Sequence, residues 1–116
     1  MPVDLGRVFV KAPGWRVDSG GKLLIEEDAL VFKIDVLDRL IGRKGFRIER
    51  NRIKEWRTLE SSSLLRKLPS IEICTDRGCY LIMFPKGGSE PPEERLGSLI
   101  SWLEAPKDSS DASSGP

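Results

Sequence analysis

The sequence predicts a mainly β protein: a curled antiparallel sheet or barrel of about seven strands, capped by one C-terminal α-helix. Short runs rich in β-branched and aromatic residues alternate with turn residues through most of the chain. One amphipathic pattern follows them, with apolar residues at i, i+3, i+4 and i+7, namely Leu96, Leu99, Ile100 and Leu103. Strands and helices do not alternate in the βαβ manner, so we expect neighbouring strands to run antiparallel.

Length and composition place these elements in one domain. The chain has 116 residues, of which 32% are charged and 39% hydrophobic, enough for a single core. We expect residues 1–14 to form an N-terminal arm or edge strand, residues 15–105 the domain, and residues 106–116 a disordered tail. There is neither a long apolar run nor a secretory signal pattern, so we expect a cytoplasmic protein.

The first half of the chain predicts a hairpin. Apolar runs at residues 22–26 and 29–35 flank a two-residue turn. In the second run apolar and charged residues alternate, so one set of side chains should face the core. We expect Ser19–Gly21 to separate this hairpin from a short alternating segment at residues 15–18.

The middle of the chain is less regular. Residues 36–41 fit either a strand end or a helical turn, and Phe46–Arg50 alternates as a strand. The alternation then slips, which predicts a turn or bulge at Asn51–Arg52 and a separate strand at Ile53–Leu59. We expect residues 61–68 to form a loop.

The second predicted hairpin carries both cysteines, Cys74 and Cys79. If residues 75–78 form a four-residue loop, the cysteines face each other and could form a disulfide. If the loop is residues 76–78 with a bulge, Cys74 faces Tyr80 instead. We expect two free thiols. Because the chain has no His, a zinc site would need four cysteines or carboxylate ligands, and we predict no metal and no cofactor.

The C-terminal helix has clear end signals. Pro91–Pro92 stands at its entrance, Glu93 and Glu94 suit the positive end of the helix dipole, and Pro106 ends it. Its apolar stripe must be buried, and a sheet is the only large apolar surface available. Trp102 lies beside this stripe, where it could form the rim of the contact or an exposed anchor for a partner.

This order of elements resembles a pleckstrin-homology-like domain, most closely its GRAM and bacterial PH relatives. The segments that carry the resemblance are Gly21–Ile25, Ala29–Phe32, Phe46–Trp56, Ile71–Phe84 and the helix with its apolar stripe. The resemblance implies a barrel of two near-orthogonal sheets plugged by the helix, and a domain that binds lipids, peptides or proteins and is rarely catalytic. In phosphoinositide-binding members basic residues flank the turn between the first two strands. The turn assigned to that place, Glu26–Asp28, is acidic, which argues against head-group recognition there.

The charge distribution suggests a binding surface. Residues 39–67 contain ten basic and three acidic residues, a net charge of +7, whereas the whole chain carries +1. The candidate binding residues are Arg43, Lys44, Arg47, Arg50, Arg52 and Trp56. They could attract an acidic peptide, an anionic membrane or a nucleic acid, although Trp56 is the only aromatic residue placed for base stacking. The alternative is an exposed strand face whose charges prevent aggregation.

Motifs of catalysis are lacking. The chain has no His, no carboxylate pair embedded in apolar sequence, and no glycine-rich loop that leads into a helix. We therefore predict a non-catalytic binding or adaptor module that docks a protein or peptide at a sheet edge or in the groove beside the helix. Peripheral binding to anionic membrane lipids is the alternative, and nucleic-acid binding is a second alternative.

Overall fold

The computed structural model describes residues 3–16, 18–35, 40, 42, 44–63, 66–86 and 90–105, without the side chains of residues 60–63, 66 and 67. The elements in chain order are β1 (Val3–Lys11), β2 (Ser19–Glu26), β3 (Ala29–Ile34), β4 (Phe46–Glu49), a 3-10 turn η1 (Arg50–Arg52), β5 (Ile53–Ser63), β6 (Arg66–Thr75), β7 (Gly78–Met83) and the helix α2 (Pro92–Glu104).

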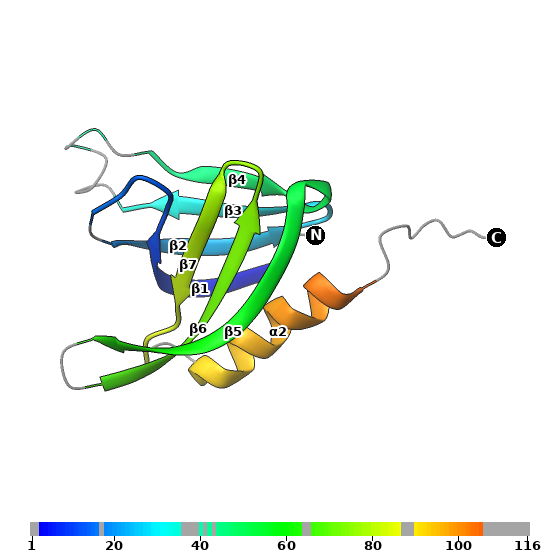
Figure 1. Cartoon of the computed structure of the whole chain (residues 1–116). Coiled ribbons are helices and arrows are strands. Elements are labelled where there is room, and N and C mark those ends of the chain that lie inside the picture. The colour runs from blue at the N-terminus through cyan, green and yellow to red at the C-terminus, as the bar shows by residue number, and fades with distance from the viewer. Residues whose placement is uncertain are drawn as a thin grey trace.

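The strands form one curled antiparallel sheet that does not close. Its seven strands run in the order β4-β3-β2-β1-β7-β6-β5, which leaves β4 and β5 at the two edges. In Figure 1 the strands β1–β4 cross the steeper strands β5–β7, and α2 lies below the second group. The predicted fold class, a mainly β chain with a curled sheet and one C-terminal helix, is confirmed.

β1 differs from the expectation of an arm or edge strand at residues 1–14. It lies in the middle of the sheet, paired with β2 on one side and with β7 on the other. Val8 and Val10 are fully buried in the core, and Phe9 is the residue between them that pairs with Met83 of β7. The central position of β1 follows from its pairing with β7, which lies far away in the sequence.

β2 begins earlier than predicted. Ser19–Gly21 belongs to the strand instead of interrupting it, because the glycines permit close packing. A Cβ atom at Gly21 would lie 2.8 Å from the ring of Phe32 in the neighbouring strand β3. Glycine in a strand often marks such a close approach. The two-residue turn that joins β2 to β3 is confirmed.

The link from β4 to β5 follows the prediction, but the loop at residues 61–68 does not. η1 supplies the predicted turn, whereas residues 36–41 lie largely outside the described residues. β5 continues to Ser63 and pairs with β6 as far as Arg66. Main-chain pairing with residues 66–68 extends this two-stranded ribbon through the three serines, so they do not end the strand.

The β6–β7 hairpin has the first of the two predicted registers. Thr75 pairs with Gly78 and Cys74 with Cys79, so the turn residues are Asp76 and Arg77. The expectation of two free thiols is wrong, because a disulfide joins Cys74 and Cys79, whose Cα atoms lie 4.0 Å apart. Directly opposed side chains on neighbouring strands are the closest pairs in a sheet, which brings the two sulfur atoms together.

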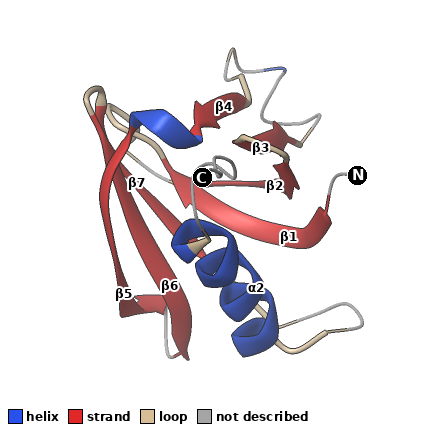
Figure 2. Ribbon diagram, turned by 90° about the vertical axis from the view of Figure 1, so that its right-hand side faces the viewer, coloured by secondary structure: helices blue, strands red, loops and turns tan. Residues whose placement is uncertain are grey.

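α2 covers the open mouth of the curled sheet. It packs against β1 and β6, as Figure 2 shows from the side. Leu99 is fully buried, and Leu96, Ile100 and Leu103 are partly buried against the core, so the predicted stripe is confirmed. Trp102 is half-buried at the rim of this contact.

Among the described residues, no helix is long and apolar enough to cross a membrane.

Candidate functional site

The structure does not bring the predicted basic residues together into one patch. Arg43 lies outside the described residues, and Lys44 is exposed just before β4. The other four candidates lie on β4, η1 and β5 and fall into two pairs: Arg47 and Arg52 line one cleft, and Arg50 and Trp56 line another.

Arg47 is held by acidic neighbours on the outer face of the sheet. Its Nε atom donates to Glu49 at 2.6 Å, and its Nη1 atom donates to Glu26 at 2.7 Å. These hydrogen bonds, first that of Glu49 and then that of Glu26, raise the pKa of Arg47 above its ordinary value. With two carboxylates on one guanidinium, little positive charge is left for an anionic partner.

Arg50 has a structural role at the end of α2. Its Nη2 atom donates to the carbonyl oxygen of Trp102 and, at 2.7 Å, to that of Ala105. The guanidinium also lies 5.0 Å from the centre of the Trp102 ring. The last carbonyls of a helix lack partners within the helix and form its negative end. Arg50 therefore caps α2 and ties it to η1.

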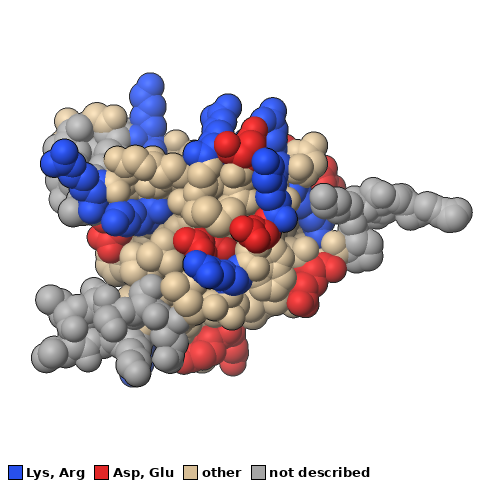
Figure 3. Space-filling view, viewed as in Figure 1, with Lys and Arg blue, Asp and Glu red and all other residues tan. Residues whose placement is uncertain are grey.

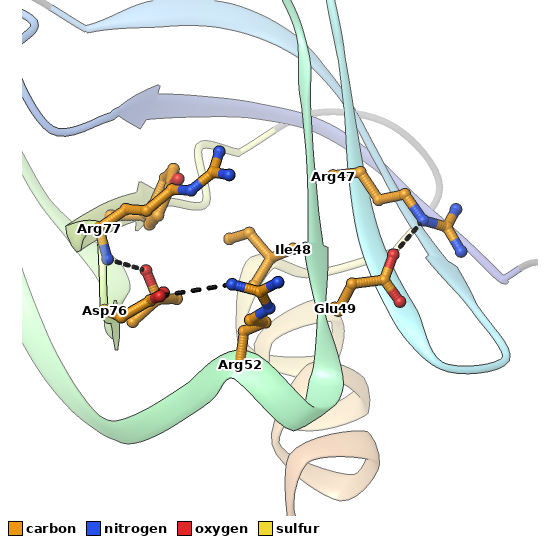
Figure 4. A pocket seen from close by; sticks show the side chains of 8 residues that line it. Arg47, Ile48, Glu49, Arg52, Asp76 and Arg77 are labelled. Carbon is orange, nitrogen blue, oxygen red and sulfur yellow. Dashed lines mark hydrogen bonds and ion pairs between the residues drawn. The ribbon is translucent and has the colours of Figure 1, made fainter.

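Arg52 lines a small cleft between η1 and the β6–β7 turn. The cleft has a volume of about 140 Å³ and is lined by Arg47, Ile48, Glu49, Arg52, Thr75, Asp76, Arg77 and Tyr80. Figure 4 shows Arg52 directed toward Asp76, and these side chains form an ion pair at 3.4 Å. Arg77 is exposed on the turn. Asp76 and Glu49 offset most of the positive charge, so the cleft is suited to weak anion binding.

Trp56 lines a groove between β5 and the end of α2. The groove has a volume of about 300 Å³ and is lined by Arg50, Ile53, Lys54, Glu55, Trp56 and Leu103. Trp56, Ile53 and Leu103 are partly buried against the core, so they present an apolar floor. Lys54 and Glu55 are exposed at its border. This is the predicted groove beside the helix, and the charge at its border is mixed.

The groove runs along a strand edge that has no partner among the described residues. β5 pairs there only with β6. The amide of Phe84 donates to the carbonyl oxygen of Pro69, so the main-chain carbonyl of Pro69 faces β7. The direction of the main-chain groups alternates along a strand, so those of Ser70 and Glu72 face β5. Arg57 pairs with Glu72 and Leu59 with Ser70, so the main-chain groups of Arg57 and Leu59 face β6. The main-chain groups of Trp56 and Thr58 therefore point outward from the sheet.

Charged side chains are mixed on the face seen in Figure 3. Lys and Arg project from its upper part, and Asp and Glu lie between them. Oppositely charged side chains also pair across neighbouring strands, as Arg57 of β5 does with Glu72 of β6 at 2.8 Å. Three described cations of the predicted basic run, Arg47, Arg52 and Arg57, are thus engaged in exposed ion pairs, as expected of an exposed strand face with paired charges.

Arg95 is a buried cation that the sequence analysis did not single out. It lies on α2 with only 5% of its surface exposed. Its guanidinium donates to the carbonyl oxygens of Leu5 at 3.1 Å, of Arg7 at 2.7 Å, and of Pro85. Desolvation lowers the pKa of Arg95, and the charge of Glu90 partly offsets this. Its place four residues before Leu99, on the buried stripe, was the signal available in the sequence.

Comparison of the chain with protein-family models, with curated proteins and with solved structures found no match.

Proposed function

We propose that this chain is a non-catalytic binding module of the pleckstrin-homology-like type that docks an extended segment of a protein partner along β5. The observation that carries the proposal is the outward-pointing main chain of Trp56 and Thr58 beside an apolar groove. The curled sheet with its C-terminal helix supports the likeness to that family.

The docked segment would extend the sheet by one strand. Main-chain hydrogen bonds to Trp56 and Thr58 supply affinity that does not depend on sequence, and pockets for alternate side chains supply specificity. An apolar side chain of the segment fits the groove between Trp56 and Leu103. An acidic side chain of the segment, beside that apolar one, would form an ion pair with Lys54, which is exposed at the border of the groove.

The experiment uses Thr58→Pro, which removes one outward N–H group. Because this N–H does not take part in the ladder with β6, proline is tolerated here as on other edge strands. The matched control, Thr58→Val, keeps the N–H and suits a strand. A library of extended peptides is selected on the wild-type protein, and the dissociation constants of the selected peptides are measured for all three proteins.

We expect Thr58→Pro to weaken binding about tenfold or more, the loss of at least one main-chain hydrogen bond, and Thr58→Val to bind as wild type. Backbone amide shifts on peptide addition should cluster at β5 and at Leu103. Peptides that bind both variants equally, or that shift residues of β2 and β3 instead, would contradict docking on this edge. Circular dichroism establishes that Thr58→Pro is folded.

Anionic membrane lipid is the second candidate, and the cleft at the β6–β7 turn is the observation that favours it. Arg52 and Arg77 line this cleft together with Tyr80. Sedimentation with phosphatidylserine vesicles tests it. Binding that is lost at high salt and in Arg77→Gln would support lipid recognition, and binding unaffected by both would exclude this cleft.

A further inference from the structure

The outer face of the β5–β6–β7 hairpins carries a cluster of metal-ligand side chains that the peptide-docking proposal does not use. Glu72, Cys74 and Cys79 each offer one ligand atom, and these atoms lie within 4.8 Å of one another. They line a cleft of about 320 Å³ together with Glu55, Trp56 and Arg57. In the structure the two sulfur atoms are joined as a disulfide.

The sheet register explains why these side chains meet. Cys74 pairs with Cys79 of β7 on one side and with Glu55 of β5 on the other. Opposed residues share a face of the sheet, and Glu72, two residues before Cys74, lies on that same face. One row across three strands thus presents a carboxylate and two sulfur atoms, with the second carboxylate beside it.

We propose that reduction of the Cys74–Cys79 disulfide creates a zinc site with the two thiolates and the Glu72 carboxylate as ligands. Thiolate and carboxylate are ligands that Zn²⁺ accepts in tetrahedral geometry, with ligand atoms about 3.5 Å apart. Small side-chain rotations bring the cluster to this spacing. The three protein ligands leave a fourth position for water, and the cleft is open to solvent there.

The surroundings fit a bound cation. Arg57 donates to one oxygen of Glu72 at 2.8 Å, and the other oxygen remains available as a ligand. A hydrogen bond of this kind orients a metal-bound carboxylate. The negative charge of two thiolates and Glu72 exceeds the single charge of Arg57, and Glu55 adds a further carboxylate at the rim.

The disulfide is accessible for reduction at Cys79, which is exposed. A dithiol reductant attacks one sulfur, the S–S bond breaks, and the reductant leaves as its own disulfide after transferring two electrons and two protons. Zn²⁺ then forms two Zn–S bonds and displaces the two thiol protons to solvent, and a carboxylate oxygen of Glu72 is the third protein ligand. The oxidised hairpin lacks thiolates and cannot form this site.

The experiment compares the oxidised protein with protein that has been reduced by a dithiol and then desalted without oxygen. Zn²⁺ is titrated by calorimetry, and Co²⁺ is used as a spectroscopic probe of thiolate ligation. We expect one metal ion per chain in the reduced protein, a thiolate-to-cobalt absorption band, and no such binding in the oxidised protein. Equal binding by both forms, or none by the reduced form, would overturn the proposal.

Glu72→Gln tests the carboxylate, with Glu104→Gln as the matched control on the exposed end of α2. Glu72→Gln should weaken zinc binding about tenfold or more, and Glu104→Gln should leave it unchanged. If Glu72→Gln binds as tightly as wild type, the three-ligand site is wrong. Cys79→Ser should abolish binding, and if that variant does not fold, Glu72→Gln still decides the question because it keeps both cysteines.

Discussion

Arg95 is the residue whose surroundings are most specific to this fold. Its guanidinium enters the sheet at an irregularity in β1, where the register with β2 shifts between Asp4 and Gly6. Gly6 has a φ of 80°, and a Cβ atom there would lie 3.3 Å from Nη1 of Arg95. The glycine therefore supplies both the left-handed backbone and the space for the buried cation.

Replacement of Arg95 by Met tests the value of this contact. The variant keeps an apolar stem of similar length but leaves the carbonyl oxygens of Leu5, Arg7 and Pro85 without their donor. Buried acceptors without partners are costly, so we expect the free energy of unfolding to fall by about 2–4 kcal/mol. Urea denaturation measures the change. Glu104→Gln on the exposed end of α2 is the control, and equal stability of the two variants would contradict the role.

At the scale of the element, α2 is held by cations at two places. Arg95 anchors its buried stripe to β1, and Arg50 caps its C-terminal end from η1. Glu93 and Glu94 occupy its first turn, where they suit the dipole. The helix is thus fixed both to β1 and to the bend between β4 and β5.

Arg50 and Arg52 make a matched pair for separating structure from surface charge. Arg50→Met removes the cap of α2 and should lower the free energy of unfolding by about 1–2 kcal/mol. Arg52→Met removes only an exposed ion pair and should change it by less than about 0.5 kcal/mol. Thermal and urea unfolding measure both. If the two variants lose equal stability, the carbonyl contacts of Arg50 contribute nothing.

Several elements could be predicted from local pattern because their signals are local. The alternation in β3 and the apolar stripe of α2 fixed which side chains are buried. The extended β5–β6 ribbon could not be predicted, because Ser61–Ser63 become a strand only through pairing with residues 66–68. The central place of β1 likewise depends on β7, which lies far away in the sequence.

At the scale of the whole molecule, the sheet consists of two parts with one junction. The first four strands pair with neighbours in sequence, as do the last three, and three residue pairs of β1 and β7 join the two parts. α2 spans the junction because it packs against β1 and β6. Arg95 also spans the junction, because its guanidinium donates to the carbonyl oxygen of Arg7 in β1 and to that of Pro85, two residues after the end of β7.

Hydrogen exchange should reveal this arrangement. In Arg95→Met we expect the amides of Phe9–Lys11 and of Leu81–Met83 to exchange faster, whereas those in the β2–β3 ladder keep most of their protection. Short ladders open locally at lower free energy than the core does. Exchange is followed by NMR or mass spectrometry. A uniform increase throughout the sheet would mean that the junction does not open separately.

The candidate site was only partly predictable for a related reason. The sequence indicates cations at residues 43–57 but not their partners, and Arg47 and Arg50 are engaged by groups distant in sequence. A groove beside the helix was named as a docking place, but its lining was not predicted: Trp56 was selected with the basic residues, and Leu103 as part of the buried stripe. The ligand cluster at Glu72 depends on a hairpin register that the sequence left open.

The position of β1 also sets the order in which the molecule can assemble. The two parts of the sheet, β1–β4 and β5–β7, can each form from contacts between successive strands. Joining β1 to β7 instead closes a loop of about 70 residues, as between Lys11 and Leu81. Such long-range contacts slow folding. We therefore expect the rate-limiting event to be the meeting of these two preformed parts. Because the tight turns are already formed at that point, substitutions in them should alter the folding rate more than the unfolding rate.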